Sequence, residues 1–274
     1  EDDKVRGKPE KFADHYTQAT LFWNSQTPIE KAHIVRGFRF ELTKVQVPAV
    51  RERVVAMLAN VDEILAEAVA EGLGIPVPEP LPKALDLLDL EIEPEMTTSP
   101  ALSLFARPGE AGVGTRKIAL LVADGAEGAD LQTLHRGLSE LGAVPRYVGA
   151  RLGGVATGEG GRLEVEVTLE TTPSVLYDAV VVPGGEDAAA ALTRNGQALE
   201  FLKDQYRHCK PMLVIGAGAN VLEEAGLSAT LPSGDPDPGL LLRPDGLGED
   251  GLALFVSAVA KHRHFDRAMD PPRV

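Results

Sequence analysis

This chain has very little cysteine and fewer basic than acidic residues. Each of these shortages excludes some kinds of site or partner. Cys209 is the single cysteine among 274 residues, which excludes an internal disulfide and a zinc site built from several cysteines. This usage is typical of a reducing compartment, so we expect a cytoplasmic protein. Acidic residues number 41 against 27 basic ones, which gives a formal net charge of −14, and no sizeable basic patch interrupts the sequence. We therefore expect no nucleic acid and no membrane as a partner, because their anionic surfaces would be repelled.

Long apolar runs are also missing. No run approaches the roughly 18 residues that a membrane-spanning helix needs, and no signal-peptide pattern opens the chain. The 44% hydrophobic and 25% charged shares are those of an ordinary globular protein. The chain is long enough for more than one domain, and since it starts with Glu1 we expect a piece of something longer.

Composition divides the chain into two parts joined by a proline-rich segment. Residues 1–74 carry 12 acidic and 10 basic side chains, so most of the negative charge falls on the remainder. The segment 75–100 holds six prolines, each of which fixes φ and interrupts helices, as in a semi-extended linker. We predict a helical domain at 1–75, a linker and the start of the next domain at 76–114, and a second domain at 115–274.

The first part has the signals of amphipathic helices. Thr27, Pro28 and Glu30 form a capping-box pattern that predicts a helix start. Apolar residues then recur on one face, at Ile34, Phe38, Leu42 and Val45. A second helical stripe runs from Pro48 to the glycines at 72 and 74, with a possible break near Asn60 or Asp62. Because neither stripe is buried by its own helix, each needs a partner surface.

The second part alternates between strand and helix patterns. Short apolar runs at 117–122, 179–183 and 212–215 predict strands that are covered on both faces. Helical segments are predicted at 130–141, 188–207, 219–225 and 249–262. This alternation predicts an α/β fold with a doubly wound parallel sheet. The strict alternation at 162–170 predicts a half-exposed hairpin strand instead.

The predicted strand at 212–215 runs into a sharp turn of two glycines and two alanines. In many α/β enzymes such a turn presents a nucleophile, but Gly216 and Ala217 carry neither a thiol nor a hydroxyl. Gly216 and Gly218 match the start of a dinucleotide-binding fingerprint, yet Val221 replaces its third glycine. The simpler interpretation is that the glycines permit a tight turn and a close approach of the helix to the sheet.

The other reactive side chains do not supply a site. Cys209 lies seven residues before Gly216, on the order of 20 Å along a strand, so we expect a packing role for it. His262 and His264 are two residues apart and point to different faces of a helix, which prevents them from chelating one metal. We predict no metal site in this chain.

Two segments of the second part resemble the class I glutamine amidotransferase-like superfamily, which includes the PfpI-type peptidases. They are 120–131 and the run around Pro183, Gly184 and Gly185. The resemblance implies a turn with backbone donors at these three residues, and an acid after the first strand, where Asp130 falls in place of the usual glutamate. It also implies a cysteine and a histidine at the elbow, but Gly216 and Ala217 occupy their positions. The implied site is degenerate, and no catalytic residue is predicted.

A longer resemblance covers nearly the whole chain. "LFWNSQTPIEKAHIV", "FELTKV" and "VRERVV" resemble the helical domain of large-subunit haem catalases. "ALSLFARP" at 101–108 resembles the start of their flavodoxin-like C-terminal domain, and "AVAKHRHFDR" resembles its last helix. The implied fold is a flavodoxin-like doubly wound sheet preceded by an all-α segment.

The same resemblance implies which parts of a catalase are missing. The family's haem site lies in a β-barrel domain and includes a tyrosine ligand with an arginine four residues before it. Here the residues four before the four tyrosines are Phe12, Ala143, Pro173 and Leu202. We therefore expect no cofactor in this chain, haem in the intact parent, the missing barrel as a partner, and a homotetramer.

Two classes of function follow. The first is the C-terminal part of a catalase that converts hydrogen peroxide to water and oxygen, with this segment inactive alone and acting as a stabilising, oligomer-supporting region. The alternative is a chaperone-like or small-molecule-binding module with a degenerate PfpI-like site. A surviving hydrolase would require Cys209 to be essential.

Overall fold

A computed structural model describes residues 4, 7, 9–89, 92–106 and 112–274. The chain forms two compact units, residues 1–107 and 108–274, and each is described by itself. No helix of the described residues is long and apolar enough to cross a membrane.

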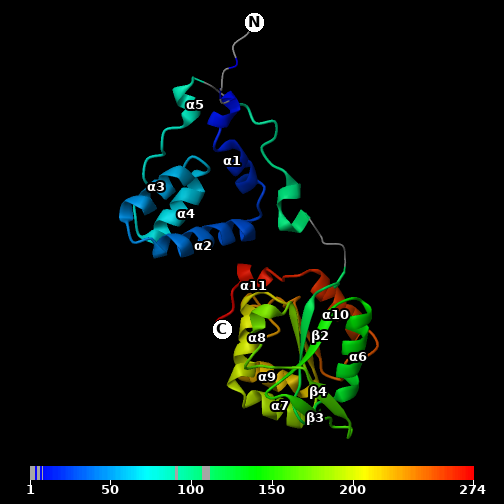
Figure 1. Cartoon of the computed structure of the whole chain (residues 1–274). Helices are drawn as coiled ribbons and strands as arrows, with labels where there is room; N and C mark the ends of the chain where they lie inside the picture. The colour runs from blue at the N-terminus through cyan, green and yellow to red at the C-terminus, as the bar shows by residue number, and fades with distance from the viewer. Residues whose placement is uncertain (1–3, 5–6, 8, 90–91, 107–111) are drawn as a thin grey trace. The chain divides into compact units, whose positions relative to one another are not determined.

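The first unit is helical (Figure 1). Its elements are α1 (Thr17–Asn24), α2 (Pro28–Lys44), α3 (Pro48–Leu58), α4 (Glu63–Leu73) and α5 (Ala84–Leu87), with short 3₁₀ turns at Glu10–Ala13, Pro100–Leu102 and Leu104–Ala106. The predicted capping box at Thr27 and Glu30 is confirmed. The second stripe breaks where Asp62 accepts a hydrogen bond from Leu65 N at 2.9 Å and caps α4. The core of this helical unit includes Trp23, Leu42, Val55 and Val69. Ile34, Phe38 and Val45 pack against that core.

Glu30 also binds the residues that follow the proline-rich segment to this unit. Its buried carboxylate accepts hydrogen bonds from Thr27 N (2.8 Å), Thr27 Oγ1 (2.9 Å), Ser103 Oγ (2.9 Å) and Leu104 N (2.7 Å). Burial alone would raise the pKa of Glu30, but these hydrogen bonds hold the pKa below its ordinary value of 4.5. Residues 103–104, which we had placed in the linker and domain start, are therefore bound to the helical unit.

Replacing Glu30 with alanine is expected to lower the free energy of unfolding of the helical unit by about 2–4 kcal/mol, because a cap and several buried partners lose their acceptor. In the wild type, the folded pKa of Glu30 lies below the unfolded value. Its contribution is therefore present above about pH 4.5 and is lost as the pH falls through the folded pKa. Trp23, the single tryptophan, is buried in this unit and reports its unfolding in urea by fluorescence. Glu41→Gln is the control, since Glu41 is exposed and pairs with Lys44 at the surface. An equal loss in both variants would contradict the assignment.

The second unit is a doubly wound α/β fold, as predicted. Its sheet has the order β5-β2-β1-β6-β7-β8, and all neighbouring pairs are parallel. The strands are β1 (Lys117–Leu121), β2 (Val144–Gly149), β5 (Val167–Thr168), β6 (Ala179–Val182), β7 (Met212–Ile215) and β8 (Leu240–Arg243). A separate antiparallel hairpin joins β3 (Gly153–Ala156) and β4 (Arg162–Val165).

Helices cover both faces of this sheet (Figure 1). They are α6 (Gly128–Glu140), α7 (Glu186–Thr193), α8 (Gly196–Arg207), α9 (Ala219–Glu224), α10 (Gly251–Ala260) and α11 (Asp266–Met269), with 3₁₀ turns at Ser174–Leu176 and Gly216–Gly218. On one face Ile118 and Leu120 of β1 pack in a core with α6 and α10 side chains such as Leu134 and Phe255. On the other face Ala119 and Leu121 pack with residues of α7, α8 and α9. Alternate residues of one buried strand thus serve two cores.

Two predicted elements were wrong in extent. The helix predicted at 188–207 is two helices, because the Asn195 side chain accepts hydrogen bonds from Gln197 N (3.0 Å) and Ala198 N (3.2 Å) and starts α8 anew. The strand predicted at 162–170 divides at Glu166: β4 belongs to the hairpin, whereas β5 joins the main sheet beside β2.

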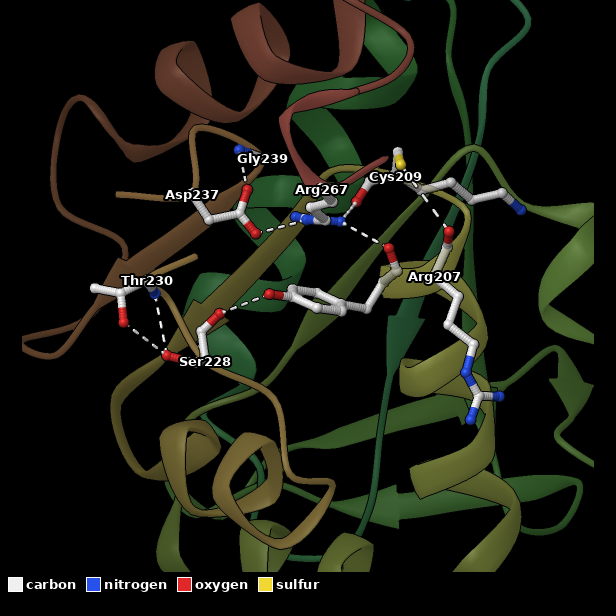
Figure 2. Close-up of polar contacts among 9 residues, drawn as sticks. Arg207, Cys209, Ser228, Thr230, Asp237, Gly239 and Arg267 are labelled. Carbon is white, nitrogen blue, oxygen red and sulfur yellow. Dashed lines mark hydrogen bonds and ion pairs between the residues drawn. The ribbon is translucent and has the colours of Figure 1, made fainter. Parts of the chain in front are cut away.

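A buried ion pair holds the C-terminal helix α11 to the sheet (Figure 2). Arg267 Nε lies 2.5 Å from Asp237 Oδ2, and the two side chains are 2% and 0% exposed. Arg267 Nη1 donates to Lys210 O at 2.7 Å, and its guanidinium lies 4.3 Å from the centre of the Tyr206 ring. Asp237 Oδ1 accepts from Gly239 N at 2.8 Å. These contacts join three segments that are far apart in the sequence, at 206–210, 237–239 and 267.

Candidate functional site

The turn after β7 has the backbone of an elbow but no reactive side chain. Gly216 has φ +47°, in the left-handed region. A Cβ added there would lie 3.6 Å from Gly184 Cα and 3.9 Å from each carboxylate oxygen of Glu127, so the space would admit a side chain. A Cβ on Gly218 would instead lie 2.7 Å from Pro183 O. Gly218 thus permits the close approach of helix and sheet expected from the sequence.

The Pro183–Gly184–Gly185 turn lies beside this elbow. It follows β6, which pairs with β7 so that Val182 is opposite Val214. Gly184 O accepts a hydrogen bond from Glu127 N at 3.1 Å. Gly185 has φ +100°, and a Cβ there would overlap the carbonyl oxygen of Gly125. The structure thus brings the loops after β1, β6 and β7 together at the carboxyl edge of the sheet, where ligands bind in open α/β folds.

The acid beside the elbow is Glu127, which our sequence comparison missed. Asp130, the residue matched to that position, lies in the first turn of α6, where its Oδ2 accepts from Leu247 N at 2.9 Å. Glu127 precedes α6 and still belongs to the loop that faces Gly184 and Gly216. Asp130 is three residues further along the chain, so it lies within α6, and its side chain contacts the loop that contains Leu247 instead of the elbow.

The surroundings of Glu127 raise the pKa of its carboxyl group. Burial raises the pKa of Glu127, and the negative charges of Asp130 and Glu159 raise it further. Glu159 reaches over from the β3–β4 turn and accepts a hydrogen bond from Gly128 N at 3.1 Å, which lowers the pKa of Glu159. A protonated carboxyl can donate a hydrogen bond, but Gly216 and Ala217 offer no nucleophile for it to assist.

Cys209 lies at the opposite end of β7. It is in the turn between α8 and β7 (Figure 2). Its side chain is buried, with 5% exposed. All of β7 separates it from Gly216, which agrees with the separation expected from the sequence. His264 is buried with Nε2 3.1 Å from Ala258 O, whereas Nε2 of His262 lies 3.8 Å from Asp178 Oδ1. Among the described residues, no group of three or more histidine, cysteine or acidic side chains could hold a metal ion.

Comparisons with known proteins assign both parts of the chain. Residues 9–73 match the family described as catalase-related immune-responsive, and residues 114–269 match the C-terminal domain found in long catalases. The chain belongs to the long-catalase family. It is 37% identical to catalase HPII of Pseudomonas putida over 96% of this chain and 35% of that protein. It is 36% identical to catalase HPII of Mycobacterium avium over 98% of this chain and 38% of that protein, and 35% identical to catalase-2 of Bacillus subtilis over 97% and 36%.

This long-catalase chain thus spans about a third of the length of the curated relatives it matches. The resemblance to large-subunit catalases stated above is confirmed, and so is the α/β fold class.

The tyrosines of this long-catalase chain do not fit haem iron. A tyrosine that binds haem iron does so through its deprotonated oxygen, and burial raises the pKa of Tyr147 and of Tyr177 to about 12, which opposes that deprotonation. The Tyr206 hydroxyl donates to Ser228 O at 3.1 Å, and burial raises its pKa as well. Tyr16, in the helical unit, follows Phe12 rather than an arginine at the fourth position before it.

Proposed function

We propose that this chain is the non-catalytic C-terminal region of a large-subunit catalase that decomposes hydrogen peroxide to water and oxygen. Haem would be held by the barrel of the parent, and this region would stabilise a cytoplasmic homotetramer. The domain limits proposed above, 1–75, 76–114 and 115–274, are kept, with the 103–104 segment bound to the helical domain. Gly216 and Ala217 are the remains of an enzyme's elbow, with the Pro183–Gly185 turn beside them.

The observation that carries this proposal is the apolar surface of the helical unit. Phe40 on α2 and Ile64 on α4 are 63% and 70% exposed. Further large apolar side chains of this unit are exposed, namely Phe12, Phe22, Val47, Leu87 and Leu104. Contiguous exposed apolar surfaces mark protein interfaces, and we propose that these side chains contribute to one. Because the chain belongs to the long-catalase family, we propose that the partner in this interface is the barrel domain of the same catalase.

Co-purification tests the proposal. The chain would be co-expressed with a tagged fragment of Pseudomonas putida catalase HPII, comprising the part that this chain does not match. We expect the two to co-purify, and Phe40→Asp to reduce the recovered chain at least about tenfold, because a carboxylate would be buried in the interface. Glu67→Gln, an exposed change on α4, is the control. Absence of wild-type binding, or equal loss in both variants, would count against the proposal.

A chaperone-like module is the second candidate, and the same exposed apolar side chains favour it. A chaperone would suppress light scattering by a client protein during thermal unfolding, whereas a purely supporting region would leave the scattering unchanged. Suppression that persists in Phe40→Asp and needs no catalase fragment would favour the second candidate.

A further inference from the structure

The amino edge of the sheet, opposite the elbow, gathers basic side chains from three distant segments. Arg116 precedes β1, Lys210 precedes β7, and His262 and Arg263 follow α10. Asp178, which precedes β6, is the carboxylate among them. Because α10 ends where the parallel strands begin, these residues meet at one edge although up to 147 positions separate them.

Asp178 is shared among several donors. Its Oδ1 lies 3.4 Å from Arg116 Nη1 and 3.8 Å from His262 Nε2, and its Oδ2 accepts from Lys117 N at 2.9 Å. Arg263 donates from Nη1 to His262 O at 2.9 Å. In the described part of the chain Arg263 has no ion pair within 4.0 Å. Asp178 therefore acts on two guanidinium groups, an imidazole and the Lys210 ammonium, which donates to Ser174 O and Tyr177 O. Asp204 is a second carboxylate that acts on Lys210, so three cations share two carboxylates.

This excess of positive charge is partly withdrawn from water. Burial lowers the pKa of Arg263 although Asp178 acts in the opposite direction, and Arg116 lowers it further. Burial and then the charges of Arg263 and Arg116 lower the pKa of His262. A partly buried cation without a counter-ion costs free energy. The C-terminus of α10 offers only about half a negative charge, and its effect falls off within one turn, so it does not balance these groups.

We propose that the amino edge of the sheet binds a phosphate-class oxyanion between Arg116 and Arg263. Guanidinium groups bind such oxyanions through paired N–H donors, and the bound charge would offset the excess at this edge. The Arg116 and His262 side chains are 32% and 46% exposed, so an ion can reach them from solvent. This site is independent of the elbow and of the proposed catalase role.

The test is calorimetric titration of the full chain with pyrophosphate at constant ionic strength, adjusted with sodium chloride. We expect saturable binding to the wild type, and Arg263→Gln and Arg116→Gln each to weaken it roughly tenfold to a hundredfold, the effect of one charged hydrogen-bonded contact. Arg194→Gln removes an exposed arginine after α7 and is expected to bind as the wild type does. Citrate, titrated in the same way, shows whether the site binds carboxylates as well as phosphates.

Absence of saturable binding by the wild type, or an equal loss in Arg194→Gln, would overturn the proposal. If Arg263→Gln fails to fold, the titration of His262 in the wild type replaces it, followed by NMR and assigned with His262→Gln. Bound pyrophosphate is expected to raise the pKa of His262, because a nearby anion favours the imidazolium. No change in that pKa would equally overturn the proposal.

Discussion

Gly185→Ala is expected to lower the free energy of unfolding of the α/β unit by roughly 3–5 kcal/mol. Two causes combine at this position. Gly185 has φ +100°, which an L side chain rarely adopts, and an added Cβ would overlap the carbonyl oxygen of Gly125. Neither the turn after β6 nor the loop after β1 can yield freely, because Glu127 N is hydrogen-bonded to Gly184 O. Hydrogen exchange of β6 and β7 peptides in urea measures the loss.

Gly184→Ala is the matched control, one residue away in the same turn. A Cβ there would meet the end of the Glu127 side chain, which can rotate away, and Gly184 has no positive φ. Its cost is expected to stay within about 1 kcal/mol. Similar losses in both variants would show that the turn tolerates Cβ atoms equally, contrary to the geometry described for the elbow.

Arg267→Met is expected to destabilise the α/β unit by about 3–5 kcal/mol, because Asp237 would remain buried without its partner. The carbonyl oxygens of Lys210 and Tyr206 would lose a donor as well. The C-terminal segment should separate first, so the α11 peptide is expected to gain the largest increase in hydrogen exchange. Urea unfolding followed by exchange in the β7 peptide gives the magnitude.

Two further variants separate charge from packing at this ion pair. Arg273→Met changes an exposed arginine of the same C-terminal segment, and its effect should remain below about 0.5 kcal/mol. Arg267→Met combined with Asp237→Leu removes both buried charges, and we expect it to recover part of the stability lost by Arg267→Met. A double variant less stable than Arg267→Met would contradict the ion-pair explanation.

Local signals predicted the parts of the fold that local physics determines. The capping box at Thr27 and Glu30 acts within one turn, and the runs of β1, β6 and β7 are apolar because both faces are covered. β2 and β8 were not predicted. Pro145 and Arg146 interrupt the apolar run of β2, and the apolar run of β8 has only three residues before Arg243. The second function of Glu30, binding Ser103, depends on a contact 73 residues away that no local pattern encodes.

The sites show the same division. The absence of a nucleophile at Gly216 is visible in the sequence, but the identity of the acid beside it depends on where α6 begins, and this favours Glu127 over Asp130. The basic edge around Asp178 was invisible, because Arg116 and Arg263 come together only through the parallel sheet and the direction of α10. The net charge of the whole chain is negative and gives no sign that this edge of the sheet is locally basic.

We propose that this catalase region supports a reaction that it does not itself perform, and mixing the purified chain with haem and hydrogen peroxide tests this proposal. We predict a Soret band identical to that of free haem and no oxygen release above the free-haem rate, while full-length catalase-2 of Bacillus subtilis serves as the positive control. A shifted Soret band together with rapid oxygen release by this chain alone would contradict the account.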